Sequence, residues 1–524
     1  MAFETISTSL TSTYVIDPND TVYVLAGAGV TSSGSAILGE NDDPLYLVVD
    51  GWVVAASTSV TLGDLVTDTS ALSVLVGETG VIRNVSSATG VFIQRTGSDI
   101  TNHGEISGDY RGIMYSAGAL TGSLDNTGLI SARTSAAVYV SGAEASTSGT
   151  FDVYNSGTIT GDTAAIHVRY QNLDVVNSGS LVGGYAVNLQ SNNTSSNSLY
   201  LNNYGEIIGG VYAVFAANSD DIVINSGTMT GAIALNGGND YFDGRGGSVS
   251  GIVAGGAGDD TYIIDDAGIQ LQETGNPGVD TVQSYVGWKL GDNFENLDLL
   301  GEADLRGIGN AENNVINGNI GDNVLYGKVG NDTILGAVGD DFLSGQDGND
   351  DLNGGDGNDV MRGGKGHDDM VGGFGDDDMR GGRGHDDISG GDGDDVLIGG
   401  GGNDILSGGD DNDILVGGTG TDMLTGGAGE DTFVFSRASH SDTLANADHI
   451  TDFVIGEDLI DLSGFAGTLS FIGSGLYSNT AGEVRVATVG ADSRVRIDVD
   501  GDGATDVNIV IEGVTGLTAL DFLL

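Results

Sequence analysis

Apolar residues recur at every ninth position from residue 318 to residue 434, where the chain divides without a gap into 13 units of nine residues. The first position is always glycine, the fourth is glycine except at Asp411, and the sixth is aspartate except at Asn323. The eighth position is apolar in every unit: Leu325, Ile334, Leu343, Leu352, Met361, Met370, Met379, Ile388, Leu397, Leu406, Leu415, Leu424 and Phe433. This pattern predicts a very short strand around an inward-pointing eighth residue, preceded by a six-residue turn rich in glycine.

A strand this short cannot bury its apolar face alone, so the units are expected to stack on one another. Stacking brings the aspartates at the sixth position together, and carboxylates without a counter-ion repel one another. Turn carbonyls and carboxylates are the hard oxygen ligands that Ca²⁺ prefers. The repeat therefore predicts a stack that binds cations. The alternative interpretation, a flexible acidic linker, is not favoured, because a linker has no need of an apolar eighth residue.

The charge of the chain agrees with this expectation. Its 524 residues include 75 acidic and 17 basic residues, which gives a formal net charge of −58. Residues 318–434 alone contain 26 acidic and 5 basic residues. Such a charge destabilises a compact state unless cations neutralise it, and it argues against nucleic acid or a bare anionic membrane as a partner. Since the chain has no cysteine, disulfides, Fe–S clusters and thiolate zinc sites are excluded.

The nonapeptide Gly-Gly-x-Gly-x-Asp-x-apolar-x resembles the RTX, or hemolysin-type calcium-binding, repeat, and residues 255–263 form an outlying copy of it. The resemblance implies a parallel β-roll with two units per coil and Ca²⁺ between successive coils, on the order of ten ions in all. The implied ligands are the aspartates at the sixth position: Asp260, Asp332, Asp341, Asp350, Asp359, Asp368, Asp377, Asp386, Asp395, Asp404, Asp413, Asp422 and Asp431.

The N-terminal half carries a different repeat, in which an Asn-x-Gly turn precedes an apolar residue. Its asparagines are Asn102, Asn126, Asn155, Asn177, Asn203 and Asn225, at spacings of 24, 29, 22, 26 and 22 residues. This length suits one coil of a wide parallel β-helix with three short strands, whose Val, Ile and Leu alternate inward. Stacked asparagines can form amide ladders between such coils. This half resembles the β-helices of autotransporter-like passengers, and residues 1 to about 75 are expected to cap the first coil.

The C-terminal segment differs from both repeats. Residues 448–453 and 456–463 resemble the module that ends serralysin-type secreted proteins. An acidic loop follows with the spacing of an EF-hand loop, although it lacks the glutamate at position twelve. We expect a Ca²⁺ site there, with the candidate ligands Asp498, Asp500, Asp502 and Asp506.

Export is expected to depend on the C-terminal end. The N-terminus lacks a basic segment followed by an apolar run, and the most apolar stretch, residues 45–56, is too short to cross a bilayer. Residues 507–524 are apolar and nearly free of charge, and in the RTX family such termini are uncleaved signals for type I export. The expected location is extracellular or at the cell surface of a Gram-negative bacterium, with folding on Ca²⁺ binding after export.

The expected fold is all-β: a parallel β-solenoid in which an N-terminal β-helix is followed by a calcium-binding β-roll and a small β cap. The expected boundaries are a flank over residues 1–75, the β-helix over 76–235, a transitional β segment over 236–317, the β-roll over 318–434, and the cap with its export signal over 435–524.

Parallel β-helices joined to RTX repeats also occur in alginate epimerases, and RTX modules occur in metalloproteases, so an enzyme is the alternative to a structural protein. The chain has no His-Glu-x-x-His, no Gly-x-Ser-x-Gly and no Walker loop. The acidic pair Asp220 and Asp221 is interpreted as a turn, and the β-helix has few basic residues with which to bind an anionic glycan.

These observations favour a non-enzymatic, secreted calcium-binding protein of the cell surface or matrix, such as an S-layer subunit, an adhesin or a filament former. Its expected partners are calcium ions together with further copies of the chain or a cell-surface glycan. The alternative is a polysaccharide-modifying β-helix enzyme, an epimerase or lyase, with an RTX export module. A cluster of catalytic carboxylates with Lys or Arg on one β-helix face would favour the enzyme.

Overall fold

The computed structural model divides into two compact units, Met1–Thr281 and Val282–Leu524. It describes residues 3–16, 20–39, 45–62, 72–94, 97–116, 121–142, 149–191, 197–274, 278–436 and 446–524. Almost all regular structure in these ranges is β-strand, the exception being the short 3₁₀ helix η2 (Ala519–Asp521). The described residues include no helix long and apolar enough to cross a membrane.

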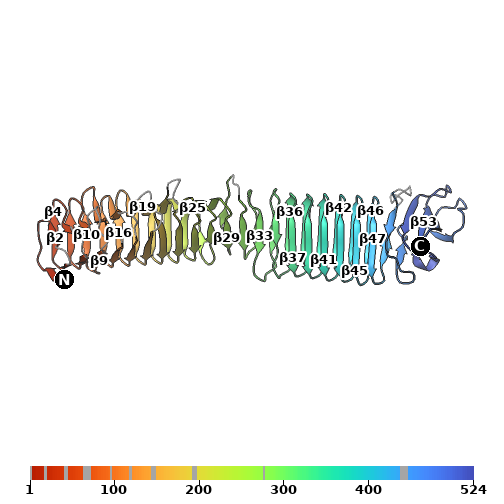
Figure 1. The fold of residues 1–524 in the computed structure, drawn as a ribbon, viewed down its shortest axis with the longest axis horizontal. Helices are drawn as coiled ribbons and strands as arrows, with labels where there is room; N and C mark the ends of the chain where they lie inside the picture. Colours follow the sequence, from red (N-terminus) through yellow and green to blue (C-terminus); the bar gives the residue numbers. More distant parts are fainter. Residues whose placement is uncertain are drawn as a thin grey trace. The chain divides into compact units, whose positions relative to one another are not determined.

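The first unit is a parallel β-helix whose coils follow one another in chain order (Figure 1). One row of strands consists of β1 (Phe3–Ile6), β3 (Thr21–Val24), β6 (Leu45–Val49), β9 (Leu72–Val76), β12 (Ser98–Asn102), β15 (Gly122–Asn126), β18 (Thr150–Asn155), β20 (Asn172–Asn177), β22 (Leu199–Asn203), β24 (Ile222–Asn225), β26 (Tyr241–Asp243) and β29 (Thr261–Ile264). A second row consists of β4 (Gly29–Ser32), β7 (Trp52–Ala55), β10 (Val81–Asn84), β13 (Glu105–Gly108) and β16 (Leu129–Ala132). A third consists of β2 (Tyr14–Ile16), β5 (Ile37–Gly39), β8 (Val60–Leu62), β11 (Thr89–Ile93), β14 (Arg111–Ser116) and β17 (Ala136–Ser141).

The second and third rows merge in the later coils of this unit. The strands β19 (Thr158–Arg169), β21 (Ser180–Gln190), β23 (Glu206–Phe215) and β25 (Thr228–Gly237) each replace two shorter ones. β19 pairs with both β16 and β17, and the register shifts between Gly161 and Ala164, where the merged strand bends. The unit continues with β27 (Ser248–Val249), β28 (Ile252–Ala257) and β30 (Gln270–Leu271). The expected coil of three short strands is therefore present in the earlier coils. In the later coils, one bent strand replaces the strands of the second and third rows.

The asparagine repeat forms a continuous ladder inside the first unit. The side-chain nitrogen of each asparagine donates to the side-chain oxygen of the next one along the stack, over 2.7 to 2.8 Å. All six side chains are buried, from Asn102 to Asn225. Because every coil must place one asparagine at the same height, the ladder fixes the register of strands whose spacing in sequence varies from coil to coil.

The segment expected to cap the first coil contributes coils of the same kind. Val22 pairs with Leu47 and Leu47 pairs with Val74 in parallel register, and all three side chains are buried. Alternating valine and leucine give these strands one apolar face that can continue the same core.

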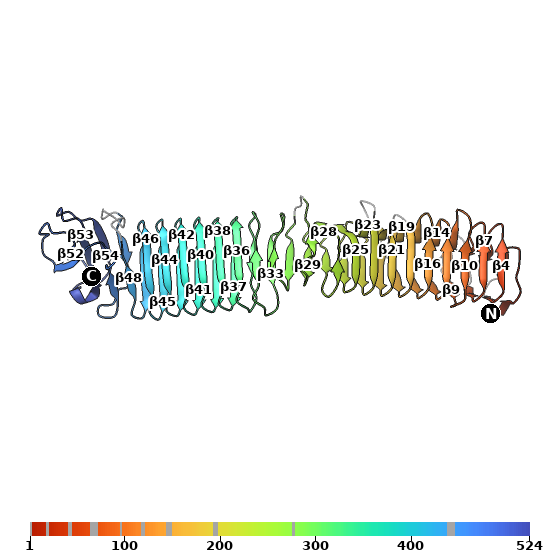
Figure 2. The same cartoon turned by 180° about the vertical axis from the view of Figure 1, so that it is seen from behind.

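The second unit is a parallel β-roll whose coils repeat every 18 residues (Figure 2). One row consists of β32 (Trp288–Lys289), β34 (Arg306–Ile308), β36 (Val324–Val329), β38 (Phe342–Asp347), β40 (Val360–Lys365), β42 (Asp378–Arg383), β44 (Val396–Gly401), β46 (Ile414–Thr419) and β48 (Thr432–Val434). The other consists of β33 (Asn296–Leu299), β35 (Val315–Asn317), β37 (Thr333–Val338), β39 (Asp351–Asp356), β41 (Asp369–Phe374), β43 (Asp387–Asp392), β45 (Ile405–Asp410) and β47 (Met423–Ala428).

Two nonapeptides therefore make one coil, as the resemblance implied. The side chains at the eighth position stack inside the roll: Leu343 pairs with Met361, Met361 pairs with Met379, and all are buried. The strands are longer than expected, six residues in place of about three, because each continues through the first three positions of the next unit. Gly364, at one of these positions, pairs with Gly382 in the same register as the apolar residues.

A small β cap completes the second unit. β52 (Glu483–Val489), β53 (Asp492–Asp498) and β54 (Val507–Ile511) form an antiparallel meander, onto which β51 (Ser470–Gly473) packs in parallel. The cap joins the roll through β49 (Asp448–Ile450), which pairs with β47 and β54, and through β50 (Leu459–Asp461), which pairs with β48 and β55 (Phe522–Leu523).

Candidate metal centre

The aspartates at the sixth position form two ladders along the β-roll. In each rung, the backbone N–H of one aspartate donates to Oδ1 of the aspartate one coil later, as from Asp350 to Asp368 at 2.9 Å and from Asp368 to Asp386 at 3.1 Å. The first ladder runs through Asn314, Asp332, Asp350, Asp368, Asp386, Asp404, Asp422 and Asp448. The second runs through Asn323, Asp341, Asp359, Asp377, Asp395, Asp413, Asp431 and Asp458.

The second oxygen of most of these carboxylates is buried and has no hydrogen-bond partner. This holds for Oδ2 of Asp332, Asp341, Asp350, Asp359, Asp368, Asp377, Asp386, Asp395, Asp404, Asp413 and Asp422. A buried carboxylate oxygen without a partner is costly unless a proton or a cation neutralises it. Hard carboxylate oxygens at regular intervals match the ligand chemistry of Ca²⁺, so the residues fit that ion.

Two of the recurring glycine positions of the nonapeptide are required by the carboxylate and by the neighbouring coil. A Cβ at the first position would overlap the carboxylate of the same unit, as at Gly354, where it would meet Oδ2 of Asp359. The fourth position has a positive φ, 141° at Gly357, and a Cβ there would overlap the backbone oxygen of Gly339 in the previous coil. The glycines thus allow the turn to close around the carboxylate and the coils to approach one another.

Burial raises the pKa of the ladder carboxylates in the metal-free state. Burial raises the pKa of Asp377 to about 7. The N–H of Asp359 donates to Asp377 and lowers this pKa, whereas the negative charges of Asp359 and Asp395 raise it. The pKa of Asp341 and of Asp404 is raised to about 7 for the same main reason. Without cations, these groups would therefore hold part of their protons at neutral pH.

A third carboxylate ladder lies in the first unit. The N–H of Asp221 donates to Asp240, that of Asp240 donates to Asp260, and that of Asp260 donates to Asp280. Oδ2 of Asp221, Asp240 and Asp260 is buried without a partner, as in the β-roll. Burial raises the pKa of Asp221 to about 9 and that of Asp240 to about 8.

Sequence reasoning found only part of this third ladder. It included Asp260, interpreted Asp221 as part of a turn, and left out Asp240 along with Asp448 and Asp458 of the β-roll. The signal available for Asp240 was the fragment of the nonapeptide at residues 237–240. Asp221, Asp448 and Asp458 lie outside any complete nonapeptide, so only the pairing of successive coils aligns them with the ladders.

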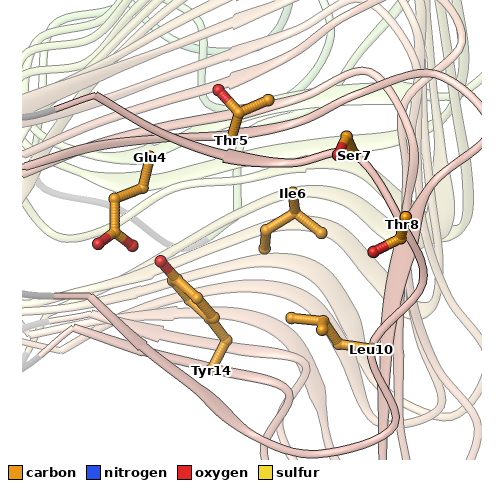
Figure 3. Close-up of a pocket in the computed structure, with 7 residues that line it drawn as sticks. All are labelled: Glu4, Thr5, Ile6, Ser7, Thr8, Leu10 and Tyr14. Carbon is orange, nitrogen blue, oxygen red and sulfur yellow. The ribbon is translucent and has the colours of Figure 1, made fainter.

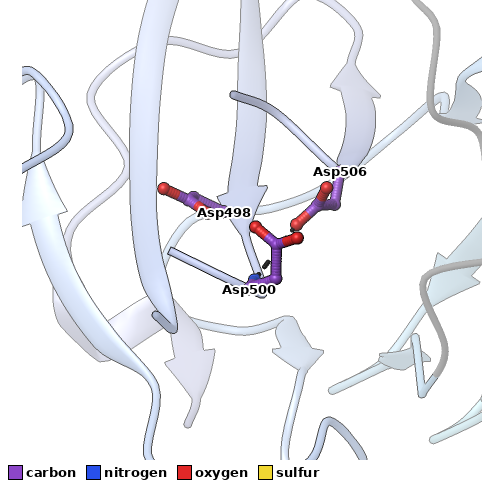
Figure 4. A group of neighbouring side chains, drawn as sticks. All are labelled: Asp498, Asp500 and Asp506. Atoms are coloured by element: carbon purple, nitrogen blue, oxygen red, sulfur yellow. Dashed lines mark hydrogen bonds between the residues drawn. The ribbon is translucent and has the colours of Figure 1, made fainter. Parts of the chain in front are cut away.

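The acidic loop of the cap brings together three of its four expected residues (Figure 4). Carboxylate oxygens of Asp498, Asp500 and Asp506 lie within 4.8 Å of one another, and Oδ2 of Asp506 also accepts from the N–H of Asp500 at 3.3 Å. Asp502 is not in this group; its Oδ1 accepts from the N–H of Ala504 at 2.7 Å. The two oxygens of Asp498 accept from the N–H groups of Gly501 and Gly503. Three carboxylates of this loop are therefore placed to share a cation.

A hollow of about 350 Å³ lies at the first coil of the N-terminal unit (Figure 3). Its lining residues are Glu4, Thr5, Ile6, Ser7, Thr8, Leu10 and Tyr14. This lining offers one carboxylate and one phenol but no cationic group, so it does not resemble a catalytic cluster.

Comparison with known proteins supports the calcium chemistry. The RTX calcium-binding nonapeptide repeat matches in overlapping segments from residue 308 to residue 436. The endo-1,3-1,4-beta-glycanase EglC of Rhizobium meliloti (strain 1021) is 35% identical over 71 residues, which are 14% of this chain and 15% of that protein. The chain therefore spans only a small part of this curated relative.

Two solved structures also match, both of them parts of the mannuronan C5-epimerase AlgE6 of Azotobacter vinelandii. The R3 subunit is 26% identical, with a TM-score of 0.21, over 31% of this chain and 80% of the subunit. The R2 subunit is 31% identical, with a TM-score of 0.17, over 29% of this chain and 90% of the subunit.

The similarity to the curated relative EglC contradicts the expectation that the chain is not an enzyme. That relative is a glycanase, an enzyme by name. The expectation was wrong because it relied on short motifs of particular enzyme families, and an active site on a β-helix can be assembled from residues in different coils that no short motif records.

The match to the nonapeptide covers the two carboxylate ladders of the β-roll from Asn314 to Asp431, which include most of the buried carboxylate oxygens that could bind Ca²⁺. Residues 308–436 are therefore an array of RTX calcium-binding nonapeptide repeats, wound as a parallel β-solenoid.

Proposed function

We propose that this chain is an exported protein that binds or modifies an extracellular polysaccharide. The RTX array would be a calcium-dependent folding module, and the N-terminal β-helix would contact the glycan. The observation that carries the calcium part is the row of buried Oδ2 atoms without partners along the β-roll. Their raised pKa values indicate that ionised carboxylates are unfavourable there without a cation. Calcium binding would therefore supply folding free energy to this unit.

The proposed ligands are the ladder aspartates from Asp332 to Asp431. Together they would bind on the order of ten Ca²⁺ ions, as the family's geometry implies. Asp260 belongs to the separate ladder with Asp221 and Asp240, which we propose as further calcium ligands. In the cap, Asp498, Asp500 and Asp506 are proposed to share one ion, with Asp502 supporting the turn.

Calcium dependence would also link folding to export. The cytosol holds too little free Ca²⁺ to fill weak sites, so the array would remain unfolded until it reached the extracellular medium. RTX repeats are typical of proteins exported by type I systems, and calcium-dependent folding is consistent with such export. It is also consistent with a location at the cell surface or in the matrix.

The polysaccharide part of the proposal is supported by the similarity to the glycanase EglC, 35% identical over 71 residues. Because this similarity covers 15% of that protein, it suggests the class of partner, a polysaccharide, without identifying its reaction. A parallel β-helix offers long rows of outward side chains on which a linear glycan can lie.

Chelation is the direct test of the calcium proposal. In the full chain, excess EDTA should remove most of the β signal of the RTX array in circular dichroism, and millimolar Ca²⁺ should restore it cooperatively. Mg²⁺ at the same concentration is the control, because it binds poorly where six or more flexible oxygen ligands are offered. A β-roll that keeps its signal and its hydrogen-exchange protection in EDTA would contradict the proposal.

The polysaccharide proposal has a separate test. The calcium-loaded chain should co-sediment with insoluble β-glucan or with an acidic polysaccharide gel, or should change the chain length or composition of a soluble one. Absence of both binding and turnover across neutral and acidic polysaccharides would contradict it, whatever the outcome with EDTA.

A further inference from the structure

Side chains from four successive coils of the N-terminal unit lie side by side in one row. Met114 of β14 pairs in register with Tyr139 of β17, Tyr139 pairs with His167 of β19, and His167 pairs with Asn188 of β21. Adjacent strands are about 4.8 Å apart, so this row presents a new side chain at each such step along the stack. The sequence places these residues more than 20 positions apart, and only the coil register brings them together.

A pocket of about 330 Å³ lies over this row. We define the basic pocket by six of its lining residues: Arg111, Tyr139, His167, Arg169, Tyr185 and Asn188. It contains two of the 17 basic residues of a chain whose net charge is −58. In a molecule this acidic, two guanidinium groups in one hollow form a local positive centre that stands out from its surroundings.

Aromatic rings are part of the lining of the basic pocket. The guanidinium carbon of Arg111 lies 3.6 Å from the ring centre of Tyr139, a cation–π contact. The ring of Tyr139 meets that of His167 edge to face at 5.1 Å. Tyr185 continues the aromatic surface, because it stacks on Tyr212 with ring centres 5.5 Å apart. The aromatic surface therefore lies beside two guanidinium groups. Arg169 donates to the hydroxyl of Tyr170 at 2.9 Å and Arg111 donates to the sulfur of Met114 at 2.9 Å, so their positive charge is not neutralised by these contacts.

Several polar atoms of the basic pocket are buried without a hydrogen-bond partner. They are Nε of Arg111, Nε of Arg169, Nε2 of His167 and Oδ1 of Asn188. The side chain of Asn188 is almost fully buried, 5% exposed. Among the described residues, no carboxylate forms an ion pair with either guanidinium group. Such a concentration of unsatisfied groups in one hollow is costly in the free protein and indicates a site that is completed by a ligand.

The titration of His167 adds to the polarity of the site. Burial, followed by the nearby positive charges of Arg169 and Arg111, lowers the pKa of His167 to about 4, although a hydrogen bond with Gln190 opposes the shift. His167 is therefore neutral at neutral pH. The positive charge belongs to the two guanidinium groups, and the imidazole is left to exchange a neutral hydrogen bond.

We propose that the basic pocket binds a carboxylate-bearing sugar residue of an acidic polysaccharide. The guanidinium of Arg169, which is more exposed than that of Arg111, would donate charge-assisted hydrogen bonds to the carboxylate. The ring of Tyr185, which is only partly buried, would pack against the apolar face of the sugar ring. His167 and Asn188 would hydrogen-bond its hydroxyl groups. The inference rests on the proposed polysaccharide function and names its substrate class and its site.

The test is calorimetric titration of the calcium-loaded full chain with a purified oligouronate. The same oligosaccharide with its carboxylates reduced to alcohols, and a neutral β-glucan oligosaccharide, serve as the other two probes. The oligouronate should bind, and Arg169→Gln should weaken it at least about tenfold, the effect of losing one charge-assisted hydrogen bond. Arg111→Lys should weaken it less, because it keeps the charge but loses the planar fork.

The matched control is Arg83→Gln. Arg83 lies in β10, outside the basic pocket, where it forms an ion pair with Glu105 at 2.7 Å, so its replacement changes the net charge equally. Circular dichroism verifies that each variant folds. Equal weakening by Arg83→Gln, or equal binding of the carboxyl-reduced oligosaccharide, would overturn the basic pocket as a carboxylate site. If only the neutral glucan bound, the polysaccharide function would stand and this inference would fall. If no probe bound, both would fall.

Discussion

At the scale of single residues, each position of the nonapeptide is determined by what it meets in its own turn or one coil away. The first-position glycine makes room for a carboxylate, and the sixth-position aspartate accepts the N–H of its counterpart. Asp386 shows both relations: its Oδ1 accepts from the N–H of Asp368, and a Cβ at Gly381 would overlap its Oδ2. A residue in such an array therefore acts in two neighbouring coils at once.

Replacing one ladder carboxylate tests this shared role. Asp386→Asn keeps the shape of the side chain and an oxygen that can accept from Asp368, but removes the charge that a cation needs. We expect the Ca²⁺ midpoint of folding, measured by circular dichroism, to rise about tenfold, because a lost ligand in a buried site costs on the order of 1–3 kcal/mol. The neighbour Asp387 points outward and is exposed, so Asp387→Asn should leave the midpoint almost unchanged. Equal midpoints for the two variants would contradict cation sharing along the ladder.

At the scale of strands and coils, the two units use different side chains for the same purpose. The β-roll aligns its coils with charged carboxylates that require cations, whereas the β-helix aligns the coils from Asn102 to Asn225 with neutral amides that satisfy one another. The asparagine ladder needs no ion, because each amide has both a donor and an acceptor. We therefore expect the N-terminal coils that carry it to depend less on calcium than the RTX array does.

The asparagine ladder can be interrupted at one rung. Asn155→Ala removes the acceptor of Asn126 and the donor to Asn177, which leaves two buried amides incompletely paired. We expect a loss of local stability of about 1–3 kcal/mol, seen as faster hydrogen exchange of β18, β20 and the strands beside them. Asn202→Ala is the control, since Asn202 donates to the exposed hydroxyl of Tyr204 outside the ladder. Similar exchange in the two variants would show that the ladder does not determine the stability of these coils.

At the scale of the whole molecule, the sequence predicted what repeats within a fixed period and missed what does not. The spacing of Leu343, Met361 and Met379 predicted a stack with a buried apolar column, and the structure confirms it. The basic pocket was missed because Arg111 and Arg169 are 58 positions apart, and the coils between them differ in length. No periodic pattern marks such residues, since they meet only after the asparagine ladder has fixed the register of the coils.

Calcium binding should release protons from the molecule. In the metal-free fold, burial raises the pKa of Asp341, Asp377 and Asp404 to about 7, far above the value of 3.8 expected in the unfolded chain. The folded metal-free array therefore binds more protons than the unfolded chain between about pH 4 and pH 7, and its stability falls as the pH rises through that window. Calcium competes with these protons.

We accordingly expect the apparent Ca²⁺ affinity of the full chain to increase from pH 6 to pH 8. Titration in weakly buffered solution with a pH electrode should record proton release as Ca²⁺ is added, and more per ion at pH 6.5 than at pH 8. An affinity that did not change over this range, with no proton release, would mean that the carboxylates are already ionised in the metal-free state.

The 18-residue period of the β-roll also limits how such a gene can change its length. Removing or duplicating 18 residues, such as 354–371, would leave every following strand in its own row, with β49 still beside its partner β47 and β50 beside β48. Removing nine would move every later strand, and the C-terminal cap with them, into the opposite row, so the cap would be turned to the other side relative to the coils before the deletion. Recombination between repeats should therefore be tolerated in steps of two nonapeptides, and arrays of this kind should lengthen or shorten by whole coils.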